Sequence, residues 1–141
     1  MEYKKHQPER IWLHLLTAPF IWLPLPFIIL VDLTTSLYQF ICFPIYKIEP
    51  VKRSKNILIF DRNKLAYLNW IEKISCMYCG YGNGVFLHLK EIAGLTEKYW
   101  CGIMHENKAG FKTQESQVKQ HFAKFGDKED FEKKYNKKLS D

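Results

Sequence analysis

The sequence IWLHLLTAPFIWLPLPFIILVDLTTSLYQFICFPIY, residues 11–46, decides the fold, because it carries a single formal charge, Asp32, in 36 positions. Its first 21 residues, 11–31, are almost continuously apolar. A helix of that length, rising about 1.5 Å per residue, can cross a hydrocarbon core of about 30 Å. The remaining 105 residues hold the other 35 charges. This division excludes a simple soluble globule. It also excludes a polytopic membrane protein, since no later stretch is long and apolar enough to span.

Three prolines, Pro19, Pro24 and Pro26, interrupt the apolar segment. Each removes a backbone donor and clashes with the preceding turn, so we expect a kink or break near residues 23–26. Asp32 would be costly at the centre of a bilayer, and it should therefore be paired or lie at an interface. Two geometries fit these constraints. One is a tilted span followed by an interfacial helix, and the other is a shallow helical hairpin bent at the prolines.

A basic segment, residues 47–64, follows directly and has a net charge of +4. Basic residues beside a membrane segment are attracted to anionic headgroups and mark the cytoplasmic side. We predict that lipid headgroups are bound by Lys47, Lys52, Arg53 and Lys55. The N-terminus is also basic, through Lys4, Lys5 and Arg10, so the segment either spans once or enters and leaves on one side. Both geometries place residues 47–141 in the cytoplasm. No nucleic-acid motif is present, and we expect no nucleic-acid partner.

Beyond the basic segment, the pattern is mainly helical. Residues 56–60 are consistent with one short strand, and apolar residues at helical spacing predict a helix over residues 63–75. Three glycines within residues 80–84 predict a tight turn, followed by a second helix over residues 84–99. The fold class is therefore mainly α: a proline-kinked membrane helix or helical hairpin, joined to a small helical cytoplasmic domain.

The chain divides into four parts. We expect a membrane anchor over residues 1–46, a basic juxtamembrane segment over 47–64, a metal-binding helical domain over 65–105, and a charged helical tail over 106–141. The tail holds 9 lysines and 7 acidic residues, with aromatic residues spaced among them. We expect these aromatic residues to dock the tail onto the rest of the domain.

The strongest chemical signal is the spacing Cys76-x2-Cys79-x21-Cys101-x3-His105. A tight turn between the first two cysteines would let their thiolates converge on one metal ion, and the second pair would complete a tetrahedron. Three cysteines and one histidine form a standard structural zinc set. We therefore predict that zinc staples two helices whose core is too small to be stable alone.

Other interpretations of this cysteine and histidine pattern stay open. The metal could instead be iron or an iron–sulfur centre, or the CxxC thiols could carry thiol–disulfide chemistry. The cysteines could also be small buried residues beside a hydrogen-bonded histidine. A closed set of four ligands leaves no position for water, which favours a structural role over catalysis. His88, in the second predicted helix, is expected to be a buried histidine and not a ligand.

Two runs, LAYLNWIEKISCMYCGYGNG (65–84) and KEIAGLTEKYWCGIMHE (90–106), resemble a family of small uncharacterised bacterial membrane proteins. That family also has an apolar N-terminus ending in a stretch similar to LYQFICFPIYKIEPVKRS (37–54). The four predicted ligands match its CxxC and YWCxxxH motifs, while Gly102 stands where the resemblance leads us to expect a proline. The resemblance implies a bacterial source and the inner membrane, and it carries no established activity.

Three functions fit these observations. The first is a membrane-anchored accessory or scaffold protein, stapled by zinc, that docks on lipid and on a larger bacterial membrane complex. The second is a redox or metal-handling protein at the membrane face, in which the CxxC thiols react and His105 tunes them. The third is a peripheral regulator that recognises anionic lipid through residues 47–64. We expect the first.

Overall fold

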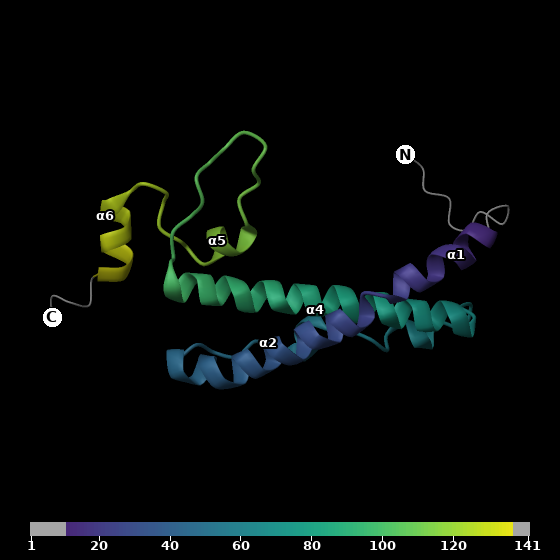
Figure 1. Cartoon of the computed structure of the whole chain (residues 1–141). Coiled ribbons are helices and arrows are strands. Elements are labelled where there is room, and N and C mark those ends of the chain that lie inside the picture. The colour runs from purple at the N-terminus through teal and green to yellow at the C-terminus, as the bar shows by residue number, and fades with distance from the viewer. Residues whose placement is uncertain (1–10, 137–141) are drawn as a thin grey trace.

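The computed structural model describes residues 11–136 of the chain, and this part is mainly helical. Two long helices, α2 (Leu25–Tyr46) and α4 (Trp70–Trp100), lie side by side (Figure 1). The shorter elements are α1 (Ile11–Trp22), α3 (Arg53–Asn56), α5 (Glu115–Lys119), α6 (Lys128–Phe131) and the single turns η2 (Arg62–Lys64) and η3 (Glu132–Asn136). Residues 11–136 contain no β-strand, so the strand predicted over residues 56–60 is wrong.

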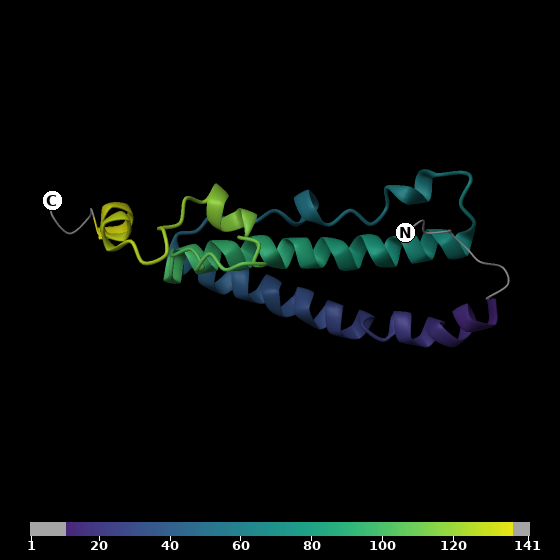
Figure 2. The ribbon, with the colours of Figure 1, turned by 90° about the horizontal axis from the view of Figure 1, so that it is seen from above.

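The predicted proline kink is confirmed. Helix α1 ends at Trp22 and α2 begins at Leu25, with Pro24 as the N-cap of α2. Pro26 lies in the first turn of α2, where a backbone N–H has no partner inside the helix. The two helices continue in one direction with a bend between them (Figure 2). They form one kinked helix, and the hairpin bent at the prolines is not observed.

Helices α2 and α4 run in the same direction. Ile28 of α2 packs on Gly82 of α4, and eighteen residues later Tyr46 stacks on Tyr99 with ring centroids 4.5 Å apart. Because residue numbers rise together along both helices, they are parallel. The connector between them, residues 47–69, therefore has to return along their length, and Figure 2 shows it as a separate layer beside α4.

Two small apolar clusters hold the three layers together. They consist of Ile28, Ile57 and Val85, and of Phe43, Val51 and Ile92. Each cluster takes one buried residue from α2, one from the connector and one from α4. The connector therefore completes the core instead of lying over a finished surface, and neither long helix buries its apolar residues against the other alone.

Helix α4 is a single helix of 31 residues, so the prediction of two helices separated by a glycine turn is wrong. It begins with a capping box. The Asn69 side chain accepts the Glu72 N–H at 2.9 Å, and the Glu72 carboxylate accepts the Asn69 N–H at 3.0 Å. These two bonds satisfy backbone donors that the first turn of a helix otherwise leaves free, and they fix where α4 starts.

The glycines predicted to turn the chain instead let the connector approach α4 closely. A Cβ on Gly80 would lie 2.8 Å from the carbonyl oxygen of Leu58, and one on Gly84 would lie 2.8 Å from the Cα of Ile57. Residues four apart share one face of a helix. Gly80 and Gly84 therefore form a flat strip on which the connector backbone rests.

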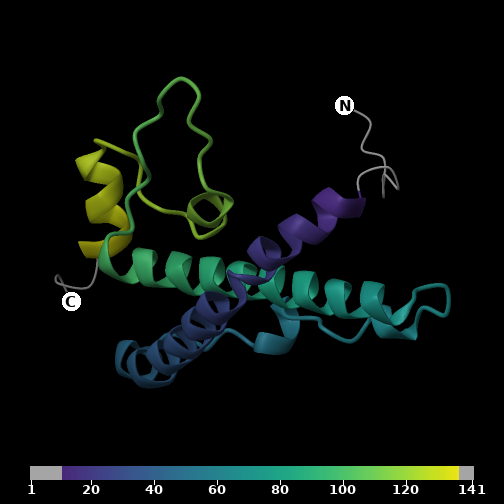
Figure 3. The same ribbon diagram turned by 45° about the vertical axis from the view of Figure 1, so that its right-hand side comes forward.

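Residues 101–136 form a small lobe at the C-terminal end of α4 (Figure 3). Gly102 has a φ of +63°, which proline cannot adopt, so glycine and not proline suits this position. Phe122 and Gln117 are buried in the lobe, and the Gln117 amide donates to the carboxylate of Glu97 at 2.7 Å. The predicted tail thus contains the short helices α5 and α6, and a buried amide joins it to α4. Docking of the tail through its aromatic residues stays a prediction.

Candidate functional site

The four predicted zinc ligands lie at opposite ends of α4. Cys76 and Cys79 are near its N-terminal end, whereas Cys101 is its C-cap and His105 follows. Cys101 comes 22 residues after Cys79, which corresponds to about 33 Å at the helical rise of about 1.5 Å per residue. A zinc–sulfur bond is about 2.3 Å long. These four residues therefore do not fit one metal ion while α4 is continuous, and the structure does not show the predicted Cys3His site.

The local surroundings agree with this separation. Cys76 is partly buried, Cys79 and Cys101 are exposed, and all three are free thiols. The Nε2 atom of His105 lies 3.7 Å from a carboxylate oxygen of Glu97. Within residues 11–136, no group of three or more His, Cys, Asp or Glu side chains is placed to hold a metal ion. Binding of zinc or iron stays a prediction, and it would require α4 to break or a second chain to contribute ligands.

Two of the four predicted headgroup-binding residues are paired inside the fold. Arg53 binds the carboxylate of Asp32, and the Lys55 ammonium lies 2.9 Å from the carboxylate of Glu91. Lys47 and Lys52 are exposed, at the C-cap of α2 and just before α3. Lipid binding by Lys47 and Lys52 therefore stays a prediction, whereas Arg53 and Lys55 also connect the connector to the two long helices.

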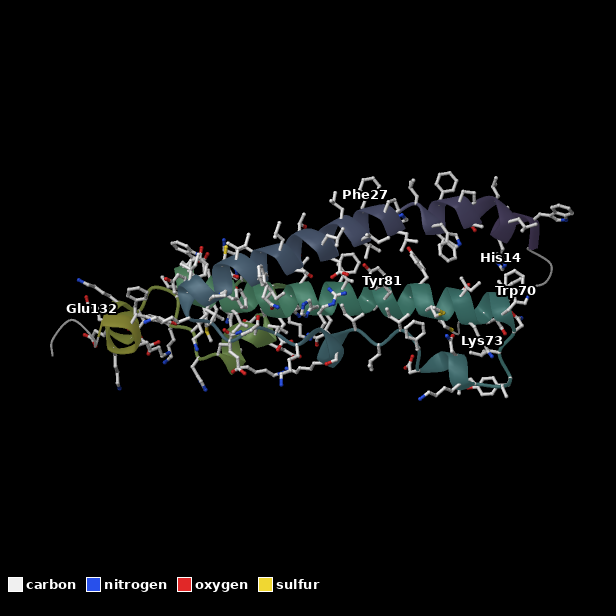
Figure 4. The ribbon with its side chains drawn as sticks, turned by 90° about the horizontal axis from the view of Figure 1, so that it is seen from below. His14, Phe27, Trp70, Lys73, Tyr81 and Glu132 are labelled. Atoms are coloured by element: carbon white, nitrogen blue, oxygen red, sulfur yellow. The ribbon has the colours of Figure 1, made fainter. Side chains whose placement is uncertain are left out.

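Asp32 is buried where α2 meets the connector and α4. Arg53 donates to both carboxylate oxygens, with Nη2 2.9 Å from Oδ2 and Nη1 on Oδ1. The Tyr81 hydroxyl donates to Oδ2 at 2.8 Å, and Figure 4 shows Tyr81 reaching from α4 toward α2. A buried carboxylate is tolerated when it is paired and hydrogen-bonded. The prediction that Asp32 is paired is thus confirmed.

A second polar group lies about two to three turns beyond Tyr81 along α4. His88 is buried, with 1% of its surface exposed, as predicted. Its Nδ1 is 3.5 Å from the side-chain nitrogen of Asn56, which also donates to Glu91 at 2.7 Å. The Nε2 atom of His88 is buried without a hydrogen-bond partner among the described residues. Both polar groups therefore join the connector to α4.

The electrostatics of these groups follow from burial and hydrogen bonding. Burial lowers the pKa of His88, which favours the neutral imidazole. Burial, together with the hydrogen bond to Asp32, raises the pKa of Tyr81 to about 12. The hydrogen bond from Lys55 lowers the pKa of Glu91 and keeps its carboxylate charged. At neutral pH these shifts favour a neutral His88, a protonated Tyr81 and a charged Glu91. The hydrogen bonds and ion pairs of these groups are suited to holding α2, the connector and α4 together.

On the side of α1 and α2 away from α4, large apolar side chains are exposed along the full length, and Figure 4 shows Phe27 pointing outward there. The apolar residues of α1, of α2 and of the turn between them that are at least 50% exposed are Trp12, Leu13, Leu15, Leu16, Phe20, Ile21, Leu23, Phe27, Leu30, Leu33, Leu37, Phe40, Ile41 and Ile45. A continuous apolar surface of this extent marks an interaction or membrane site. We call it the apolar face.

Among the described residues, one helical stretch, Trp12–Tyr46, is long and apolar enough to cross a membrane. At its kink there is an open groove of about 380 Å³, lined by Leu23, Pro24, Phe27, Ile28, Val31 and Phe86. Phe86 belongs to α4 and is 54% exposed. The apolar face therefore extends from α1 and α2 across the groove to one residue of α4.

Only part of this arrangement could be predicted from the sequence. The isolated Asp32 signalled that a partner had to exist, but Arg53 lies 21 residues away and Tyr81 lies 49 residues away. No local pattern distinguishes Arg53 from the neighbouring lysines, and Asn56 and Glu91 resemble ordinary surface residues. These partners become recognisable only once the connector is known to return along α4.

No protein-family model, curated protein or solved structure matches the chain. The resemblance to a family of bacterial membrane proteins stays a prediction.

Proposed function

We propose that the protein is a membrane-anchored scaffold, an accessory protein that docks on a larger membrane complex. One observation carries the proposal: the apolar face of α1 and α2 is joined, through the buried contact between Asp32 and Arg53, to a charged half made by the connector and the C-terminal lobe. Such a two-sided body holds a water-facing surface at a fixed orientation to a membrane. The basic residues of the connector favour the cytoplasmic side of a bacterial inner membrane.

An aromatic surface supports the docking role. At the C-terminal ends of α2 and α4, Tyr46 stacks on Tyr99, and Trp100 packs edge-on against both rings. Trp100 nevertheless leaves 67% of its surface exposed, and Tyr99 leaves 50%. Tyrosine and tryptophan are enriched among the residues that dominate binding energy at protein interfaces. We assign Tyr99 and Trp100 as the contact with the partner, at the boundary between the apolar face and the C-terminal lobe.

A second function, thiol chemistry at the membrane face, is favoured by the placement of the CxxC pair. Cys76 and Cys79 are three residues apart on α4, so they are neighbours on its surface. Cys79 is exposed and both thiols are free. If the pair is reactive, alkylation of the folded protein modifies Cys79 rapidly, and mild oxidation joins the two thiols. Two unreactive thiols under these conditions would eliminate this function.

The scaffold proposal is tested by crosslinking the tagged full chain in native membranes, followed by mild-detergent purification and mass measurement. We expect a complex of defined size whose yield falls at least tenfold in Trp100→Ala. Phe125→Ala is the matched control, because Phe125 is an aromatic residue of similar exposure, 59%, in the C-terminal lobe. A wild-type chain that stays monomeric after crosslinking, or equal losses in both variants, would contradict docking through Trp100.

A further inference from the structure

We propose that residues 11–46 do not cross the bilayer but lie within one leaflet, which makes the protein monotopic. The inference rests on the membrane anchorage proposed above and adds its geometry. The occupant of the apolar face is then the acyl region of a single leaflet, and both ends of the apolar segment lie on the same side of the membrane. Four features of the fold lead to this conclusion.

The first feature is the parallel packing of α2 and α4. Ile28 of α2 packs on Gly82 at one end and Tyr46 stacks on Tyr99 at the other, and Trp22, the last residue of α1, packs on Tyr78. If α2 stood across the membrane, α4 would stand beside it in the same direction. The connector would then have to travel back through the same bilayer between them.

The second feature is the charge on the connector. Lys55 and Asp61 enclose five uncharged residues, 56–60. Even fully extended, five residues cover about 17–18 Å, which is well short of the hydrocarbon thickness of about 30 Å. The Lys55 side chain is 67% exposed, and Arg53 is 48% exposed. If the connector crossed the bilayer, Lys55 or Asp61 would lie inside the hydrocarbon, where a charged side chain is strongly disfavoured.

The third feature is the backbone of the connector. Residues 57–61 form neither helix nor strand. Irregular backbone is not found facing lipid, because its N–H and C=O groups lack partners there. The polar side of the three-layer unit therefore has to face water along its whole length, while the apolar face on the opposite side is free to face lipid. A protein with a polar connector side and an opposite apolar face fits at the membrane–water interface and does not fit across the bilayer.

The fourth feature is the extent of α1. Its 12 residues span about 18 Å. Its described side chains are exposed almost all round and apolar, and Trp12 is 80% exposed. A helix of this length is too short to cross a hydrocarbon core of about 30 Å, and it can lie lengthwise within one leaflet. The kink at Pro24 turns α1 away from α4 (Figure 1), so α1 can lie along the interface among the acyl chains of one leaflet while α2 stays packed on α4 and the connector. The apolar groove at the kink opens on the same face and accepts acyl chains.

The test uses the depth of two tryptophans in the full chain. Single-tryptophan variants retain Trp12 or Trp22, with phenylalanine at the other tryptophan positions, and bind vesicles of phosphatidylethanolamine and phosphatidylglycerol that contain lipids brominated at defined depths. We expect both fluorophores to be quenched several-fold more strongly by bromines near the headgroup than by bromines near the bilayer centre. In a spanning helix, Trp22 would lie near the centre and Trp12 near the far interface. Strongest quenching of Trp22 by central bromines would therefore overturn the proposal, and so would an absence of quenching at both positions.

A second measurement determines sidedness. Protease added outside the vesicles should remove a tag at the N-terminus and a tag at the C-terminus at similar rates, whereas a protected N-terminal tag would show a span. A protected N-terminal tag would disprove the monotopic arrangement but would leave the proposal of a membrane-anchored scaffold unaffected. Failure of the protein to bind vesicles at all would instead remove the anchorage on which both proposals depend.

Discussion

Helices α2 and α4 are packed in parallel, yet they distribute polarity in opposite ways. Helix α2 exposes most of its large apolar residues, apart from the buried Ile28 and Phe43, and it buries its one charge, Asp32. Helix α4 buries Val85 and Ile92 together with small or polar residues such as Gly82, Gly84 and His88, and it carries its charged residues on more exposed positions. Neither helix is a conventional surface helix with a single apolar stripe.

The difference shows that polarity is sorted across the three layers and not within each helix. The outer side of α2 is apolar, the connector side is charged, and α4 lies between them. This explains why α4 needs small residues toward the connector and polar residues toward Asp32. Variants that change one layer at a time test whether polarity is divided between the layers in this way.

The largest expected effect comes from a charge on the apolar face. Leu30→Asp removes an exposed leucine, 58% exposed, from the surface assigned to lipid. Burying a leucine contributes about 1.5–3 kcal/mol, and the new charge adds to its loss, so vesicle binding should fall by more than tenfold. Leu58→Asp is the matched control, since Leu58 is 59% exposed on the connector. Vesicle co-sedimentation measures both variants, and equal losses would mean that the two sides do not differ.

Breaking the contact between layers comes next. Arg53→Met leaves the Asp32 carboxylate buried with only Tyr81 as a strong partner, and we expect a loss of about 2–3 kcal/mol of unfolding free energy. This is somewhat below the loss for a fully buried pair because Arg53 is 48% exposed. Lys52→Met, at the exposed neighbouring position, should change stability by less than about 0.5 kcal/mol. Denaturant unfolding in detergent measures both.

The partner variant Asp32→Asn, combined with Arg53→Met, should recover part of the lost stability, because no uncompensated charge is then buried. A double variant that is as unstable as the sum of its parts would show that Asp32 and Arg53 act independently.

A smaller effect is expected at the glycine strip. Gly84→Ala would place a Cβ 2.8 Å from the Cα of Ile57 and 2.9 Å from the Asn56 carbonyl oxygen, so backbone has to move. Overpacking of this kind costs about 1–3 kcal/mol, partly offset by the better helix propensity of alanine. At Gly82 the nearest atom is the Ile28 side-chain methyl at 3.5 Å. Gly82→Ala should therefore be neutral or stabilising. If thermal unfolding shows Gly82→Ala to be less stable than Gly84→Ala, the connector backbone does not rest on the glycine strip as described.

Acidification should act through His88. Its pKa is lowered in the folded state by burial, so its contribution to stability is complete above the ordinary value of 6.5 and declines as the pH falls below that value. In His88→Gln this part of the decline should disappear, whereas the exposed His121→Gln should keep it. Unfolding midpoints measured above and below pH 6.5 test this prediction. If His88→Gln loses stability on acidification as the wild type does, His88 is not the group responsible.

The smallest expected effect is that of metal removal. Because about 33 Å of helix separates Cys79 from Cys101, a chelator or Cys76→Ser should leave the unfolding midpoint unchanged. Metal analysis accompanies the unfolding curve. One tightly bound zinc per chain together with chelator-induced unfolding would show that α4 is broken in solution.

Features determined by local chemistry could be predicted from the sequence. The prolines place the kink, the length and apolarity of residues 11–46 predict a long exposed helix, and Asp32 predicts its own pairing. The predictions that depended on what packs nearby were wrong or stayed untested. Gly80 and Gly84 have the same local signature whether they turn a chain or admit a neighbour into a helix face. The turn inferred from them also made Cys76 and Cys101 look close together.

The buried contact of Asp32 has a consequence for biosynthesis. The carboxylate lies in the first part of the chain, but Arg53 and Tyr81 are synthesised 21 and 49 residues later. Until α4 has emerged from the ribosome, the apolar segment carries an unpaired acid and lacks two of the three layers that complete its core. The packing of α2, the connector and α4 can therefore be completed only late in translation, and we expect a chain truncated before residue 81 to be bound by chaperones or degraded.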